Sequence, residues 1–166
     1  MALSANRTDF RIPQDDRGGR ITPEIKNASV LYYGALVSCD TDTGAVKPFD
    51  GTKTDKLMGW HNGDSTTGST ATPPPRAQLV TGPFMWKDCP VTGLAGTNAD
   101  IGKRIFATDD GTYTRTDPGS SGAEVGVVVM YNTTAKADVW MRQVVGYVDT
   151  LTLLPTPTPT PTPTGG

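Results

Sequence analysis

The sequence predicts an all-β protein, a small antiparallel β-barrel or sandwich. Short β-prone runs alternate with turn residues between residues 28 and 149, which is the pattern of an antiparallel sheet protein. The 166 residues also include 19 glycines and 14 prolines, and these residues interrupt long helices. Because hydrophobic residues make up 36% of the chain, we expect one domain with a packed core.

The first half of this region predicts three strands and a polar loop. Residues 30–37 are apolar on both faces, so they predict one buried strand. The turn residues 40–44 follow, and residues 46–49 start the return strand. Residues 57–60 form another short apolar run. The next fifteen residues, 61–75, hold no apolar residue larger than alanine and predict a surface loop.

The second half begins with a bend and a hairpin. Residues 77–81 and 84–86 flank Gly82-Pro83, a pair that indicates a bulge or a sharp bend. Further along, Asp109-Asp110-Gly111 separates two β-prone runs. An Asp-Gly pair in this position is typical of a tight hairpin, and we expect Gly111 to supply the positive φ that such a turn requires.

Residues 125–145 predict the final hairpin. Val125, Val127, Val129 and Tyr131 alternate with their neighbours, so we expect them on one face of a strand. After a polar stretch the chain returns through an apolar run that includes Trp140. Core or interface packing is the expected role of this tryptophan, as it is for Tyr32 and Tyr33.

Composition divides the chain into an extended N-terminal arm (residues 1–27), a β-barrel body (28–149) and a Pro-Thr-rich tail (150–166). The arm mixes both charge signs with few large apolar residues, so it cannot fold alone. We expect it either to lie extended on another surface or to be disordered. In the tail, Pro-Thr occurs five times in succession. This repeat predicts a polyproline II rod of roughly 30 Å at about 3.1 Å per residue, a spacer or a solvated tail.

Charge and hydropathy bear on partners and location. With 15 basic and 17 acidic residues the net charge is -2, which disfavours direct contact with nucleic acid or a membrane surface. No long apolar stretch or signal-peptide-like segment is present, so we expect synthesis in the cytoplasm. Two cysteines do not make a disulfide framework, and we interpret both as free thiols in preference to a bridge.

The sequence lacks the minimum parts of common catalytic and metal sites. It has one histidine, His61, and no Cys-x-x-Cys, which disfavours zinc. The glycines of residues 63–68 are one residue too far apart for a nucleophile elbow. Residues 96–103 miss the phosphate-loop spacing by one residue, and Asp40-x-Asp42 lacks the later calcium ligands. We therefore expect no enzyme, no metal and no cofactor; a hydrolase that uses His61 is a third-ranked hypothesis.

Trp60 and Trp86 are candidates for surface aromatic contacts. Exposed aromatic rings can form a platform for a carbohydrate or another ring-containing ligand. Together with the Pro-Thr rod, they support an alternative function. In this alternative the chain is a carbohydrate- or receptor-binding β-domain displayed on a virion or on a cell surface.

The order of motifs along the body resembles the small capsid decoration (cement) proteins of tailed bacteriophages. The resemblance covers roughly residues 28–145 and depends on order and spacing, since each motif alone is common. The motifs are Gly34-Ala35-Leu36-Val37, Val46-Lys47-Pro48-Phe49, Leu57-Met58-Gly59-Trp60, residues 77–84, residues 101–107, residues 125–129 and Ala137-Asp138-Val139-Trp140-Met141.

The resemblance implies a β-tulip-like, non-enzymatic structural protein on the outer capsid surface of the virion. Its expected partners are the major capsid protein and two further copies of itself, in a homotrimer at local three-fold positions. It would cement neighbouring subunits and stabilise the shell against the internal pressure of DNA. An arm with apolar anchors can cross a subunit boundary and add to a sheet edge. The expected capsid-binding residues are Arg7, Phe10, Arg11, Ile12, Arg17, Arg20 and Ile21.

Overall fold

The computed structural model describes residues 3–8, 10 and 19–144, and its all-β fold confirms the expected class. The fold consists of two five-stranded sheets and a two-stranded ribbon of β2 (Val30–Leu31) and β6 (Thr66–Thr67). The first sheet has the order β1 (Arg20–Ile21), β7 (Leu79–Val80), β5 (Lys56–His61), β3 (Leu36–Cys39) and β4 (Val46–Pro48). The second has the order β10 (Tyr113–Thr114), β9 (Arg104–Ala107), β11 (Ala123–Thr133), β12 (Lys136–Met141) and β8 (Phe84–Pro90).

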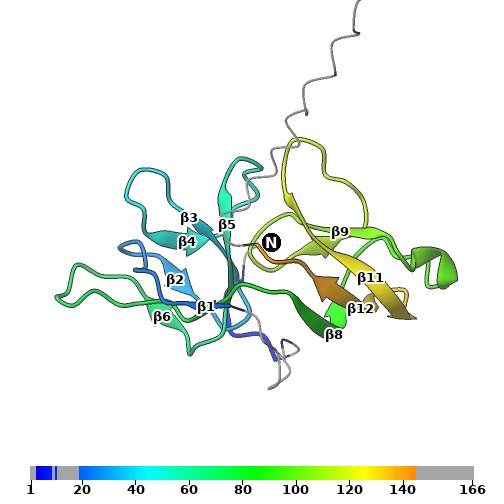
Figure 1. Ribbon diagram of the computed structural model, residues 1–166, viewed down its shortest axis with the longest axis horizontal. Coiled ribbons are helices and arrows are strands. Elements are labelled where there is room, and N and C mark those ends of the chain that lie inside the picture. Colours follow the sequence, from blue (N-terminus) through cyan, green and yellow to red (C-terminus); the bar gives the residue numbers. More distant parts are fainter. Residues whose placement is uncertain (1–2, 9, 11–18, 145–166) are drawn as a thin grey trace, which may run out of the picture.

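Neighbouring strands within each sheet run antiparallel. In Figure 1 the strands β1 to β6 lie on one side of the molecule, and β8, β9, β11 and β12 lie on the other. One turn of 3-10 helix, η1 (Asn98–Asp100), precedes β9. The chain thus completes the first sheet before it builds the second.

The predicted bend at Gly82-Pro83 is where the chain passes from the first sheet to the second. Residues 81–83 connect β7 with β8, and Gly82 has a φ of 81°. A Cβ atom at this position would lie 2.4 Å from the carbonyl oxygen of Arg142. Glycine is therefore required here both by the backbone conformation and by the close approach of the neighbouring segment.

The expectation of one strand over residues 30–37 is wrong. The segment forms β2 and β3, separated by a turn in which Gly34 has a φ of 82°. β2 pairs with β6, which lies inside the predicted 61–75 loop. Uniform apolar character conceals the break, because the turn residues Tyr32 and Tyr33 have the same β propensity as the strands on each side.

The predicted β9–β10 hairpin is confirmed, but its turn is made differently from the expectation. Tyr113 pairs with Ala107, as the hairpin requires. Gly111 does not adopt a positive φ. Instead, Asp109 Oδ1 accepts hydrogen bonds from the backbone N–H groups of Gly111 (2.9 Å) and Thr112 (2.7 Å). A side chain that folds back on the backbone therefore holds the turn.

The predicted final hairpin is also confirmed, as β11 and β12. However, Val125 does not share a face with Val127 and Val129. The register with β9 shifts between Glu124 and Gly126, so that Val125 is an extra residue in β11. Such a bulge reverses the alternation of side chains. Val125 is consequently buried in the core, whereas Val129 is 45% exposed.

The main hydrophobic core lies between the two sheets. Leu36, Trp60 and Val80 face it from the first sheet, and it receives the apolar side chains of all five strands of the second. A smaller core covers the other face of the first sheet. Its members are Ile25, Leu31, Val37, Val46, Ala77 and Leu79. The first sheet is therefore covered on both faces, as sheets with apolar residues on both sides require.

The start of the chain packs against this body and does not extend away from it. Phe10 is 1% exposed and joins the main core. Its ring meets the rings of Trp86 (4.7 Å between centroids) and Tyr33 (5.4 Å) edge to face. Residues 3–8 cross the β9–β10 turn, where the Leu3 N–H donates to Asp110 Oδ1 at 2.9 Å. The described residues of the predicted arm are thus part of the fold.

Phe10→Ala should lower the free energy of unfolding by about 3–5 kcal/mol, because a buried aromatic side chain leaves both lost contacts and a cavity. Urea unfolding measures this loss. Val129→Ala is a matched control, since its side chain is exposed, and should change stability by about 0.5 kcal/mol or less. A Phe10→Ala protein as stable as this control would contradict the packing of residue 10 in the core.

Asp110→Asn should change the pH dependence of stability. Burial raises the pKa of Asp110 to about 6, and the charge of Asp109 acts in the same direction. The unfolded chain ionises near pH 4, so stability should fall as the pH rises from about 4 to about 6. Asp110→Asn removes this fall and should stabilise the protein by about 1–3 kcal/mol at pH 7. Equal effects in urea unfolding at pH 4 and pH 7 would contradict the expectation.

Candidate interaction surface

The polar groups singled out in the sequence do not form a reaction centre. His61 is buried, and its Nε2 lies 2.9 Å from the carbonyl oxygen of Asp64. Cys39 and Cys89 are free thiols. Within residues 3–8, 10 and 19–144, no group of three His, Cys, Asp or Glu residues is placed to hold a metal ion. The same residues include no helix that could span a membrane.

The described members of the predicted capsid-binding set make contacts or pair as strands within this chain. The Arg7 guanidinium lies 4.8 Å from the centre of the Trp86 ring and donates to the Gly111 carbonyl at 2.7 Å. Phe10 is buried, and so it offers no surface to a partner. Arg20 and Ile21 form the edge strand β1. The other three members, Arg11, Ile12 and Arg17, lie outside the described residues.

The expectation that Trp60 and Trp86 form surface contacts is wrong. Both side chains are fully buried. The indole N–H of Trp60 donates to the hydroxyl of Tyr113 at 3.0 Å, which satisfies its polar atom inside the core. Trp86 packs edge to face against Phe10 and Tyr113. Neither ring is available to a carbohydrate or to a partner protein.

The second sheet presents a face that points away from the first sheet, and we call it the outer face. A row of residues crosses it in register from Arg104 on β9 to Val127 on β11. The row continues to Trp140 on β12 and Met85 on β8. The strand neighbours of Val127, Trp140 and Met85 are buried, as is Ile105 next to Arg104, and side chains alternate between the faces of a strand. The row therefore points away from the core.

Apolar side chains are concentrated at this face. Among the described residues, the large hydrophobic side chains that are exposed number four: Ile101 (48%), Val129 (45%), Met130 (51%) and Trp140 (46%). Three of them belong to the β11–β12 hairpin. Ile101 belongs to the adjacent loop, in which the Gly102 N–H donates to the Val128 carbonyl at 2.9 Å. Such a concentration is typical of an interaction site.

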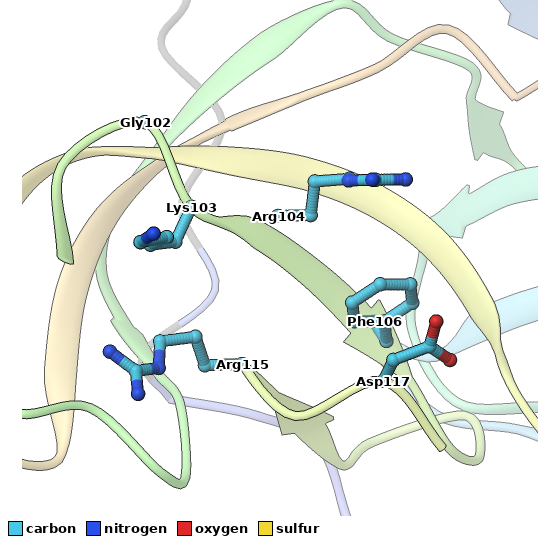
Figure 2. Close-up of a pocket in the computed structure, with 6 residues that line it drawn as sticks. All are labelled: Gly102, Lys103, Arg104, Phe106, Arg115 and Asp117. Carbon is cyan, nitrogen blue, oxygen red and sulfur yellow. The ribbon is translucent and has the colours of Figure 1, made fainter. Parts of the chain in front are cut away.

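A pocket of about 500 Å³ lies beside the row of Arg104, Val127, Trp140 and Met85. We call this row the apolar row and the pocket the cationic pocket. Its lining consists of Gly102, Lys103, Arg104, Phe106, Arg115 and Asp117. Figure 2 shows Lys103 and Arg115 at one end of the pocket and Phe106 with Asp117 at the other. Arg104 belongs both to this pocket and to the row that contains Trp140. The pocket and the apolar row are therefore continuous.

Buried carboxylates fix the arginines of the pocket. Asp100 is fully buried, and its carboxylate accepts hydrogen bonds from the N–H groups of residues 95–97 and from Arg115 at 2.6 Å. These hydrogen bonds hold the pKa of Asp100 below its usual value, against the effect of burial. Glu124, also buried, lies between Arg104 (3.3 Å) and Arg142 (2.5 Å).

This arrangement places positive charge toward solvent and negative charge beneath it. Each buried carboxylate pairs with an arginine whose side chain is partly exposed. The Lys103 amine forms no ion pair with the described residues. Guanidinium and ammonium groups held in this way bind carboxylates, through hydrogen bonds that charge strengthens.

The exposure of Trp140 could have been read from the sequence. Residues 136–141 alternate polar and apolar side chains at first, with Lys136 and Asp138 at every second position. Trp140 continues this series and therefore belongs to the solvent face. The expectation of core or interface packing is thus wrong as regards the core, and interface packing stays a prediction. The cationic pocket had no comparable signal, because its members come from the segments 102–106 and 115–117.

The fold matches that of a solved chain from the capsid of Myoviridae phage XM1. The TM-score is 0.54, and the match covers 87% of this chain and 95% of that chain. The two sequences are 15% identical, so the likeness concerns the fold. No family model matches this chain, and no curated protein matches its sequence. The protein thus has an all-β fold that is also found in a phage capsid.

Asp100→Asn should loosen the loop that forms one side of the cationic pocket. The pKa of Asp100 is lowered in the folded state, so its contribution to stability is present above about pH 4 and is lost in more acidic solution. At neutral pH, amide hydrogen exchange at residues 95–97 should speed up on the order of tenfold in the variant. Unchanged exchange at these amides would show that the carboxylate does not hold the loop.

Proposed function

We propose that this chain is a non-enzymatic structural protein of a bacteriophage capsid, of the decoration or cement class. The observation that carries the proposal is the fold shared with a chain of the phage XM1 capsid over 87% of the present chain. The order of sequence motifs in residues 28–145 supports the same class. The exposed apolar side chains and cations of the outer face suit adhesion.

In this proposal the chain binds the outer surface of an icosahedral shell and connects neighbouring major capsid protein subunits. DNA packed inside the shell pushes outward, so a cementing protein needs contacts that cross subunit boundaries. A homotrimer at local three-fold positions would multiply weak individual contacts into stable attachment. Its action would be to raise the resistance of the shell to internal pressure.

The N-terminal segment remains a proposed capsid contact through Arg11, Ile12 and Arg17. Deletion of residues 2–26 would not test it cleanly, because Phe10 and Ile25 belong to the two cores. Substitution of the three residues is a better test. The alternative of a carbohydrate- or receptor-binding domain loses the support of Trp60 and Trp86, since both are buried; the Pro-Thr rod that also suggested it lies outside the described residues.

The purified chain should sediment together with capsid shells that lack it, and bound shells should lose their DNA at a higher temperature. Native mass spectrometry of the free chain measures the expected trimer. An Arg11→Glu, Ile12→Asp, Arg17→Glu protein should bind more weakly while its unfolding curve stays unchanged. Absence of the chain from purified virions of its phage would overturn the proposal.

A further inference from the structure

We propose that the outer face of the second sheet is the capsid-docking surface, and that it fits a protein surface with carboxylate side chains beside an apolar patch. This inference rests on the proposed function and names the part of the molecule that performs it. The docking surface consists of the apolar row with Val129 and Met130, together with the cationic pocket.

The first step is that this face is left uncovered. Both faces of the first sheet are packed, one against the main core and one against the smaller core. The second sheet packs its inner face alone against other described residues. A solvent-facing sheet surface normally carries polar side chains. Here Trp140 lies in its middle, in register between Val127 and Met85, so the face is built for contact with another surface.

The second step concerns the charge of the partner. The chain as a whole has a net charge of -2, yet Lys103, Arg104 and Arg115 all line one pocket, with Lys103 and Arg115 at one end and the Arg104 guanidinium extending toward the other (Figure 2). The anionic partners of the two arginines are buried beneath them. Asp117 adds one carboxylate, and its Oδ1 accepts a hydrogen bond from the Gly119 N–H at 2.8 Å. The pocket therefore favours an incoming carboxylate, and the row beside it favours apolar side chains.

The third step distinguishes this partner from two others. A nucleic acid would need cations spread along the face, whereas the exposed side chains of Trp140 and Met130 make part of it apolar. A two-fold contact through this face would place the cationic pockets opposite like charge, which disfavours a dimer; a three-fold contact between copies would show itself in the native mass of the variant described below. Because the arginines are already held by buried carboxylates, little side-chain freedom remains to be lost on binding. A capsid subunit with exposed carboxylates satisfies all three conditions.

The test is a double substitution, Lys103→Glu with Met130→Asp, made in the full chain. Both side chains are exposed, so the variant should unfold at the same urea concentration as the wild type. Lys56→Glu, an exposed charge reversal on the first sheet, is the matched control. In co-sedimentation with capsid shells, the double variant should bind at least about tenfold more weakly, and the control should bind normally.

Each outcome has a separate meaning. If the wild type and the double variant bind shells equally well, the proposed docking surface is wrong and the proposed function stands. Failure of the wild type to bind would overturn both. A lower native mass for the double variant would show that the face joins copies of this chain, which also overturns the inference. Wild-type binding that resists high salt would refute the role of the carboxylates.

Discussion

Aromatic packing between the two sheets is the interaction on which the rest of the structure depends. Phe10 meets Tyr33 next to the first sheet, and it meets Phe84 and Trp86 of the second. The hydrogen bond from Trp60 to Tyr113 also joins the sheets and satisfies a polar atom of each residue. Edge-to-face rings combine large buried areas with a preferred geometry, so this cluster fixes the sheets relative to one another as well as stabilising them.

That packing also decides where the molecule can act. The N-terminal segment and the β2–β6 ribbon are used to complete the body, and with the smaller core they leave the first sheet covered on both sides. Among the described residues, the sheet face left uncovered is the outer face of the second sheet. Its apolar row and its cationic pocket share Arg104, whose position is fixed from below by the buried Glu124. The packing that stabilises the fold thus also determines which sheet face is exposed as the candidate site.

The sequence predicted the all-β class, the bend at residues 82–83 and both late hairpins, because turn residues at regular spacing act locally. The sequence-based predictions were wrong where the burial of a side chain depends on segments far away in the sequence. Trp60 and Trp140 have similar apolar neighbours, and the difference between burial and exposure comes from which sheet face is covered. The extra residue at Val125 reversed an alternation that was correct on each side of it. Phe10 lies in a mostly polar segment, and the rings it packs against, Phe84 and Trp86, are far along the sequence. Its burial could therefore not be predicted from its neighbours in the sequence.

The course of residues 3–8 has a consequence for synthesis on the ribosome. Contacts of Leu3 and Arg7 reach across 107 and 104 positions of the sequence. Residues 3–8 therefore cannot complete their contacts until residues 110 and 111 have been synthesised, and pairings between such distant segments form slowly. Until then, the Phe10 ring and the rings it packs against stay exposed to water. A nascent chain therefore cannot finish packing its main core before the β9–β10 turn has been made, so this segment is among the last parts of the described fold to close.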